Sequence, residues 1–368
     1  MTDKEDIVDL DSPSWFYNRR GSDWRLKVIL ANEMEAFGLR LQNNPAFVLL
    51  YNMQSFLSRR IPQKFRTSFD NALTWLRSKT LQLKGVKYII SQGRRPPVEA
   101  KKPILWETYF LPPQRGEMRS PKEFCRGGAD PWIRAIDRFG GNVKLIAVRG
   151  RYSMSCLMKM YPEYADKIVN LGFVQREYNI IPVKEIEKKQ TESNLTILFV
   201  GREAIRKGLP QLISALSRLR EEGITNFHLL VVSSFVDGKI DIPLVDWIEQ
   251  HCEIVHEELL TIFRRAQIFA MPSKYESYGL VYLEALANGC VTIARNEEPQ
   301  RELMNYGEAG VLVDAYSVED ITNHLRTVLL DREERVRLAC NAVTYYTEHL
   351  SQRVVRQNWT DALSRLRS

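Results

Sequence analysis

The chain has 368 residues, of which 44% are hydrophobic and 26% charged, and its formal net charge is +7. This length predicts two domains, and the composition is typical of a folded globular protein rather than a disordered or collagen-like chain. The sequence opens with no basic-then-apolar signal pattern, and no apolar run approaches membrane-spanning length. We therefore expect a cytoplasmic protein without a transmembrane helix. Five scattered cysteines without a CxxC pair predict neither a disulfide framework nor a zinc site.

The charge is divided unevenly along the chain. Residues 1–190 hold 33 lysines and arginines against 20 aspartates and glutamates, a net charge of +13, whereas residues 191–368 carry −6. Basic clusters lie at 58–66 and 93–102. Such a half favours an anionic partner, such as a membrane surface, an acidic glycan or a nucleic acid, and the alternative is a solvated face. Since no nucleic-acid-binding motif is present, we expect no nucleic acid, and peripheral attachment at the cytoplasmic face of the membrane.

The first half of the sequence predicts an α/β domain. Apolar residues at helical spacing favour a helix over 22–42, although 25–32 alone fits a strand. Apolar runs predict further strands, with helices between them, at 46–52, 86–93, 102–110 and 143–150. The Glu- and Lys-rich stretch 181–194 has the composition of a polar linker.

The second half alternates strands and helices more clearly. Strands are expected at 195–201, 227–234, 268–273, 290–296 and 309–315, and helices at 209–223, 257–266 and 299–307, before a long helical tail. This alternation predicts a parallel, doubly wound sheet. Because ligands bind at the carboxyl ends of the strands in such sheets, the loops 201–208 and 276–279 both fall at the expected binding edge.

The stretch YESYGLVYLEALANG, residues 275–289, places two acids in an otherwise apolar, small or aromatic run. Ser277 is a candidate cap for the helix that follows, and Gly289 stands where a left-handed terminal residue is expected. Glu284 lies on the inward stripe with Leu280, where a buried carboxylate needs a partner. Glu276 precedes the first turn, beside its free N–H groups. The alternative is an acid that only favours the helix dipole, together with a partly exposed second acid.

The loop GREAIRKG, residues 201–208, follows a predicted strand and opens a predicted helix. Backbone N–H groups at such a position can hold a phosphate. The loop is neither a P-loop nor a GxGxxG motif, but Arg202 offers a planar fork and Lys207 a point charge for phosphate oxygens. By itself this pattern is weakly specific, since a basic residue beside a turn is common.

Taken together, the motifs resemble the family-4 glycosyltransferases of the GT-B fold. GREAIRKG, the acid–x7–acid segment within 268–294 and ELMNYGEAGVLVD follow one another in the family's order and spacing over about 195–320. The resemblance implies two Rossmann-like doubly wound domains facing across a cleft. These would be an acceptor-side domain over 1–185 and a nucleotide-sugar-binding domain over 186–350, with a helix at 351–368 that returns to the first domain.

The resemblance also implies roles for individual residues. Arg202 and Lys207, beside Gly201, would bind the donor diphosphate, Glu276 would face the donor sugar and Glu284 would accept from the ribose hydroxyls. The stretch 253–256 would lie near the nucleotide base, with Val255 as its candidate contact. The backbone of four residues would hold sugar and phosphate at the helix start: Ser277, Tyr278, Gly279 and Leu280.

One feature departs from the family pattern. The family often supplies a histidine to the donor sugar from the first domain, but this chain has no histidine before His228. Glu107, Thr108 or Tyr109 occupies the comparable place, and we take Glu107 as the candidate; the alternative is that these residues are only core and turn.

The expected function is retaining, metal-independent transfer from a UDP- or GDP-linked sugar, with no cofactor, to a saccharide or lipid-linked acceptor. Cell-surface polysaccharide or glycolipid synthesis is the expected context. The alternative from another class is a non-catalytic glycan-binding or scaffold protein on a GT-B frame.

Overall fold

The computed structural model describes residues 7–9, 40–41, 88–92, 103–107, 133, 136, 142–173, 178–234, 242–252, 254–276 and 278–367. These residues divide into two compact units. One unit contains the described residues up to 173 together with 355–367, and the other contains those from 178 to 354. The divisions thus fall before Tyr178 and before Val355, compared with the predicted boundaries after 185 and after 350.

The first unit is built on a parallel sheet. Its described strands pair in the order β2-β1-β3-β4-β5-β6, each parallel to its neighbours. Helix α7 (Arg151–Met160) and a 3-10 helix (Pro162–Lys167) connect the last two strands. The strand bounds are β1 Ile7–Asp9, β2 Arg40–Leu41, β3 Tyr88–Gln92, β4 Ile104–Glu107, β5 Val143–Val148 and β6 Ile168–Asn170.

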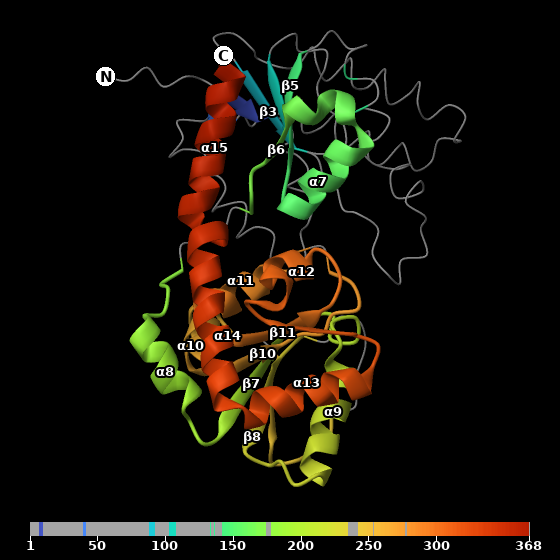
Figure 1. The fold of residues 1–368 in the computed structure, drawn as a ribbon, viewed down its shortest axis with the longest axis vertical. Helices are drawn as coiled ribbons and strands as arrows, with labels where there is room; N and C mark the ends of the chain where they lie inside the picture. Colours follow the sequence, from blue (N-terminus) through green and yellow to red (C-terminus); the bar gives the residue numbers. More distant parts are fainter. Residues whose placement is uncertain are drawn as a thin grey trace, which may run out of the picture. The chain divides into compact units, whose positions relative to one another are not determined.

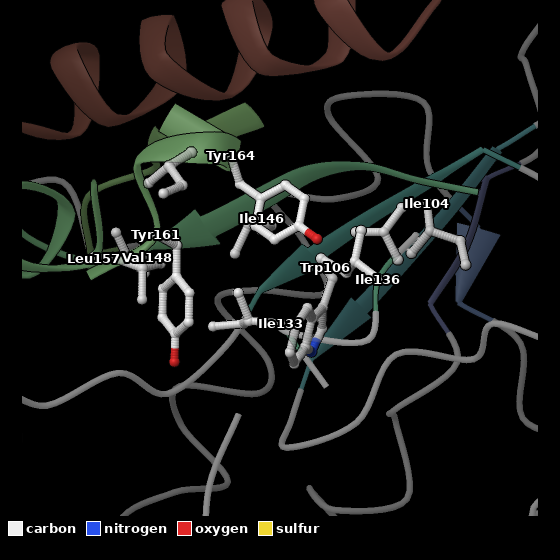
Figure 2. Packing of buried hydrophobic residues seen from close by; sticks show 11 residues of the cluster. Ile104, Trp106, Ile133, Ile136, Ile146, Val148, Leu157, Tyr161 and Tyr164 are labelled. Carbon is white, nitrogen blue, oxygen red and sulfur yellow. The ribbon is translucent and has the colours of Figure 1, made fainter. Parts of the chain in front are cut away.

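The faces of this sheet bury two apolar clusters. Figure 2 shows the first, in which Trp106 of β4 and Ile146 of β5 pack with Leu157 of α7. The second joins Leu105 and other sheet residues to helix α15 (Gln352–Arg367), which runs beside the strands in Figure 1. The helix contributes apolar residues at helical spacing, which burial against the sheet stabilises: Val355, Trp359, Ala362, Leu363 and Leu366. The C-terminal helix therefore packs on the N-terminal sheet, as the resemblance implied.

The second unit repeats the architecture. Its described strands pair in the order β12-β11-β10-β7-β8-β9, all parallel. The strands are β7 Leu195–Val200, β8 Phe227–Val232, β9 Ile248–His251, β10 Ile268–Ala270, β11 Val291–Arg295 and β12 Val311–Val313. The helices are α8 Val183–Gln190, α9 Leu209–Glu221, α10 His256–Arg265, α11 Leu280–Ala287, α12 Gln300–Leu303, α13 Val318–Leu330 and α14 Arg332–Tyr345, with a 3-10 turn at Asn305–Gly307 and a π-helical turn at Tyr346–Leu350.

The structure corrects two predictions. Arg40–Leu41, placed in a helix over 22–42, form strand β2, because pairing with β1 overrides the local helical spacing. The stretch 181–194 is not merely a polar linker, because it contains helix α8. Lys189 of that helix is buried, and its Nζ donates to Phe263 O at 3.0 Å and to Asn288 O at 2.8 Å. This polar side chain therefore forms hydrogen bonds inside the protein.

Some features fall outside the predictions or outside the described residues. Strands β1 and β9 were not predicted, since both are short and lack a continuous apolar run. The predicted strand at 46–52 and the basic clusters at 58–66 and 93–102 lie outside the described residues. Within the described part of the chain, no helix is both long and apolar enough to cross a bilayer.

Candidate active site

Two strand-to-helix loops meet at the carboxyl edge of the second sheet. The loop 201–208 joins β7 to α9, and the loop 271–279 joins the neighbouring strand β10 to α11. Gly208, with φ +84°, lies so close to the second loop that an added Cβ would stand 2.2 Å from Pro272 O. Lys274 N donates to Arg206 O at 2.9 Å. The two segments with predicted ligand roles therefore form one site.

Lys207 and Glu276 face one another across these loops. Lys207 Nζ lies 3.6 Å from Glu276 Oε2, and Arg206 Nη1 lies 3.9 Å from the same oxygen. The Lys207 stem covers Gly201, where a Cβ would stand 2.3 Å from Lys207 Cδ. Any side chain at Gly201 would displace the lysine, which explains the glycine. Arg202 begins the loop with an exposed side chain.

Gly279 sets the start of helix α11. Its φ of +83° is a left-handed conformation, and an added Cβ would stand 2.6 Å from the Tyr282 ring and 3.2 Å from Glu276 Cγ. Gly279 rather than Ser277 is the N-cap, and Ser277 lies outside the described residues. Tyr278 is buried and Leu280, the first helical residue, is half-buried. The helix ends at Ala287 with Gly289 in the expected left-handed conformation, φ +63°.

Tyr282 of α11 forms a hydrogen bond to the loop 271–279. Its hydroxyl donates to Met271 O at 2.6 Å, and its side chain is fully buried. Burial raises the pKa of Tyr282 well above its ordinary value, and the nearby Glu276 carboxylate adds to the shift. The residue therefore acts as a neutral hydrogen-bond donor at neutral pH.

Glu284 lies buried in the second turn of α11, as its inward position predicts. Its Oε1 accepts from Tyr178 Oη at 3.3 Å and lies 3.8 Å from His256 Nε2. His256 is the first residue of α10, and Val255 is the exposed N-cap of that helix. The stretch 253–256, predicted near the nucleotide base, thus ends beside the acid predicted to hold the ribose.

Glu107 belongs to the first unit and has its own partner there. It is the last residue of β4, is buried, and forms an ion pair with Arg149, which follows β5. The Arg149 guanidinium also lies 5.1 Å from the centre of the Phe173 ring. Glu107 therefore lies at the carboxyl edge of its own sheet, with its carboxylate direction set by an arginine.

Several residues around the second-unit site were not singled out from the sequence. Arg206 precedes Lys207 in the stretch GREAIRKG, and the positive charge of Arg206 was the one feature of the sequence that could have indicated its place in the site. Arg295 and Tyr178 carry no local pattern and reach the site only through folding, whereas Tyr282 lies within the quoted stretch 275–289. Arg295 ends β11 and lines a cavity of about 350 Å³ together with Glu297. Among the described residues, no group of three or more His, Cys, Asp or Glu side chains is placed to hold a metal ion.

Comparison with known proteins shows what the second unit is similar to. Residues 183–344 match the family model described as glycosyl transferases group 1. A D-inositol 3-phosphate glycosyltransferase of Corynebacterium efficiens is 38% identical over 222 residues, covering 55% of this chain and 52% of that protein. The chain thus spans about half the length of the curated relatives it matches.

Solved structures extend the likeness to both units. A glycosyltransferase from Rickettsia africae matches with a TM-score of 0.64 at 16% identity, covering all of both chains. Anabaena HepE, solved in complex with UDP and glucose, matches with a TM-score of 0.63 at 15% identity over 98% of this chain and 99% of that one. Residues 183–344 therefore resemble the glycosyl transferases group 1 family, and the chain shares its fold with these two solved proteins.

Proposed function

We propose that this chain is a retaining, metal-independent glycosyltransferase. It would move a sugar from a UDP- or GDP-linked donor to a saccharide or lipid-linked acceptor, in the synthesis of a cell-surface polysaccharide or glycolipid. The observation that carries the proposal is the approach of Lys207 to Glu276 at 3.6 Å, at the sheet edge where α9 and α11 begin. A cation suited to a diphosphate and an acid suited to sugar hydroxyls meet there.

The helix starts add to the phosphate-binding character of the site. Helices α9 and α11 both begin after a glycine in the left-handed conformation, and neither has a side-chain cap. In α9, Pro210 has no N–H and Leu209 N donates to Ala204 O, so we take α11 as the helix whose first-turn N–H groups would donate to phosphate oxygens. Lys207, with Arg202 at the loop entrance, would neutralise the charge that develops on the departing diphosphate.

The two acids would divide the donor between them. Glu276 would accept hydrogen bonds from the donor sugar and favour its positive character in the transition state. Glu284, in the second turn of α11, would accept from the ribose beside Tyr178 and His256. In the first unit, Glu107 remains a candidate for sugar contact, since Arg149 sets the direction of its carboxylate.

The names of similar proteins support the same assignment. The curated relatives include D-inositol 3-phosphate glycosyltransferases, and a similar pneumococcal O-GlcNAc transferase was solved with UDP and GlcNAc. Both proteins use sugars as substrates or ligands, which favours a sugar-transfer function for this chain over a nucleic-acid-binding one.

A thermal-shift screen with UDP, GDP, ADP and their glucose, mannose and N-acetylglucosamine conjugates tests the proposal. We expect one nucleoside diphosphate family to raise the melting temperature, because a ligand that binds only the folded state stabilises it. Transfer with that donor should survive a chelator, and the product should keep the donor's anomeric configuration by NMR. A flat panel would favour the glycan-binding or scaffold alternative; chelator-sensitive transfer or inverted product would remove metal independence or retention.

A further inference from the structure

The loop that carries Glu276 is held by two arginines from different parts of the second unit. Arg206 Nη1 donates to Tyr275 O, and Arg295 Nη1 donates to Lys274 O. Consecutive carbonyls immediately before Glu276 therefore each accept from a separate guanidinium. We call Arg206 and Arg295 the arginine clamp.

Arg206 is fixed at its other edge by Glu203. Its Nε donates to Glu203 Oε2 at 2.6 Å, and its Nη2 contacts the same oxygen. The guanidinium is planar and offers donors in a rigid fork. With one edge on Glu203 and Nη1 on Tyr275 O, the side chain has little freedom to rotate. Nη1 is also 3.9 Å from Glu276 Oε2, so the same group contacts the backbone before the acid and faces its carboxylate.

Arg295 holds the loop from the other side and is almost fully buried, at 2% exposure. Its Nη2 forms an ion pair with Glu297 while Nη1 contacts Lys274 O. The loop has internal contacts as well, since Ser273 Oγ donates to Tyr275 O at 2.7 Å. The backbone from Ser273 to Tyr275 is thereby fixed on both sides.

We propose that Arg206 is a positioning residue for Glu276, with Arg295 as its buried counterpart. The inference rests on the proposed function, because it assigns Glu276 to the donor sugar. The clamp fixes the backbone before Glu276 and the direction of its carboxylate, so the sugar is held in reacting geometry. Arg206 is thus needed for sugar-dependent binding and transfer rather than for holding the nucleoside diphosphate.

Two variants of Arg206, one control variant and one double-mutant cycle test the clamp. Arg206→Gln removes charge and fork, and Arg206→Lys keeps the charge but loses the planar fork. Both should lower transfer roughly 10- to 100-fold, as expected when a reacting group is misplaced by about 1 Å. Both should also retain nucleoside diphosphate affinity, measured by calorimetry. Arg218→Gln, an exposed arginine of α9, serves as the matched control and should behave as wild type.

A double-mutant cycle separates positioning from a general loss of stability. In a Glu276→Gln background, Arg206→Gln should cost little further transfer, because the group that it positions has already been changed. The melting temperature of each variant, with and without nucleoside diphosphate, shows whether the fold is retained. Arg295→Lys should give the same pattern as Arg206→Lys, provided that its nucleoside diphosphate stabilisation is intact.

The outcomes distinguish this inference from the proposed function. Full activity of Arg206→Lys would mean that only charge matters, which overturns positioning. Independent, multiplying effects of Arg206→Gln and Glu276→Gln would overturn it also, while leaving the glycosyltransferase assignment in place. Absence of any nucleotide binding or transfer by the wild-type chain would instead remove the proposed function, and the inference with it.

Discussion

Lys207 Nζ lies 3.6 Å from Glu276 Oε2, although the two residues come from separate strand-to-helix loops. A diphosphate that binds Lys207 would compete with the Glu276 carboxylate for the same ammonium group. When the donor binds, Lys207 would therefore exchange its contact with the Glu276 carboxylate for one with the phosphate. Glu276 would then be able to contact the sugar. The predictions below follow from this relationship and from the groups that surround it.

The first prediction concerns Lys207. Lys207→Ala should lower transfer roughly 100- to 1,000-fold, because preorganised charge stabilisation of the leaving group is lost. Arg202→Ala should act in the same direction. The fold should survive, since Lys207 is at a loop edge, and single-turnover rates together with thermal unfolding check both points. Arg218→Gln is again the control, and near-normal transfer by Lys207→Ala would remove the phosphate-loop assignment.

The second prediction concerns Glu276. Glu276→Gln should reduce the rate of transfer by about 100-fold, because a carboxylate near the developing positive centre favours the transition state. Nucleoside diphosphate affinity should not fall, since the substitution only removes the carboxylate that competes for Lys207. Stopped-flow single-turnover kinetics and calorimetry separate the two quantities. An acid that only favours the helix dipole would give a loss of a few tenths of a kcal/mol in stability and normal kinetics.

A third expectation applies to Glu284. Glu284→Gln should weaken donor binding about 10-fold or more, the cost of removing one charged hydrogen bond. Transfer at saturating donor should be nearly normal, because the ribose contact is made equally in the ground and transition states. Comparing KM with kcat distinguishes this from Glu276→Gln. A fall in kcat alone would contradict the ribose assignment.

Tyr282 gives a prediction about stability and pH. Tyr282→Phe should cost about 1 kcal/mol at pH 8, because the hydrogen bond to Met271 O is lost. The raised pKa of Tyr282 means that the folded state keeps its proton while the unfolded tyrosine loses one above its ordinary pKa of about 10. Wild-type stability should therefore be full below that pH and fall above it.

Tyr282→Phe removes the contribution of this one tyrosine to the loss of stability at alkaline pH. Urea unfolding at pH 8 and at about pH 11 should show a smaller decline for Tyr282→Phe than for wild type, by up to about 1.4 kcal/mol per pH unit. Other tyrosines titrate in both proteins, so the comparison isolates Tyr282. Identical declines would mean that Tyr282 ionises normally in the folded state.

The basic half of the sequence gives a prediction about membranes. Binding to vesicles should need acidic lipid and weaken steeply with salt, because exposed charges are screened within about 10 Å at 0.1 M salt. Charge reversal at Arg59, Arg60, Arg94 and Arg95, which lie outside the described residues, should abolish it and leave nucleotide binding intact. Equal binding to neutral and acidic vesicles, measured by sedimentation, would favour a soluble acceptor instead.

The sequence determined the second-unit sheet because buried parallel strands form nearly continuous apolar runs. Such runs, broken by glycine turns and amphipathic helices, predicted β7, β8, β10, β11 and β12. The same order placed the loops 201–208 and 276–279 at one sheet edge. Chain order was enough for this, since parallel strands bring their carboxyl ends together.

Tertiary structure decided which side chains support that edge. Arg295 contacts the loop before Glu276, and Tyr178 contacts Glu284. Both come from distant segments, and no local pattern marks a contact between residues so far apart. Helix α8 has the polar composition of a linker. Some of these polar residues, among them Lys189, are buried and bind carbonyls of the interior, which the sequence alone does not indicate. Residues Arg40–Leu41 form a strand because β1 lies beside them. Local sequence encodes periodicity, whereas partners across the fold are set only when the chain is packed.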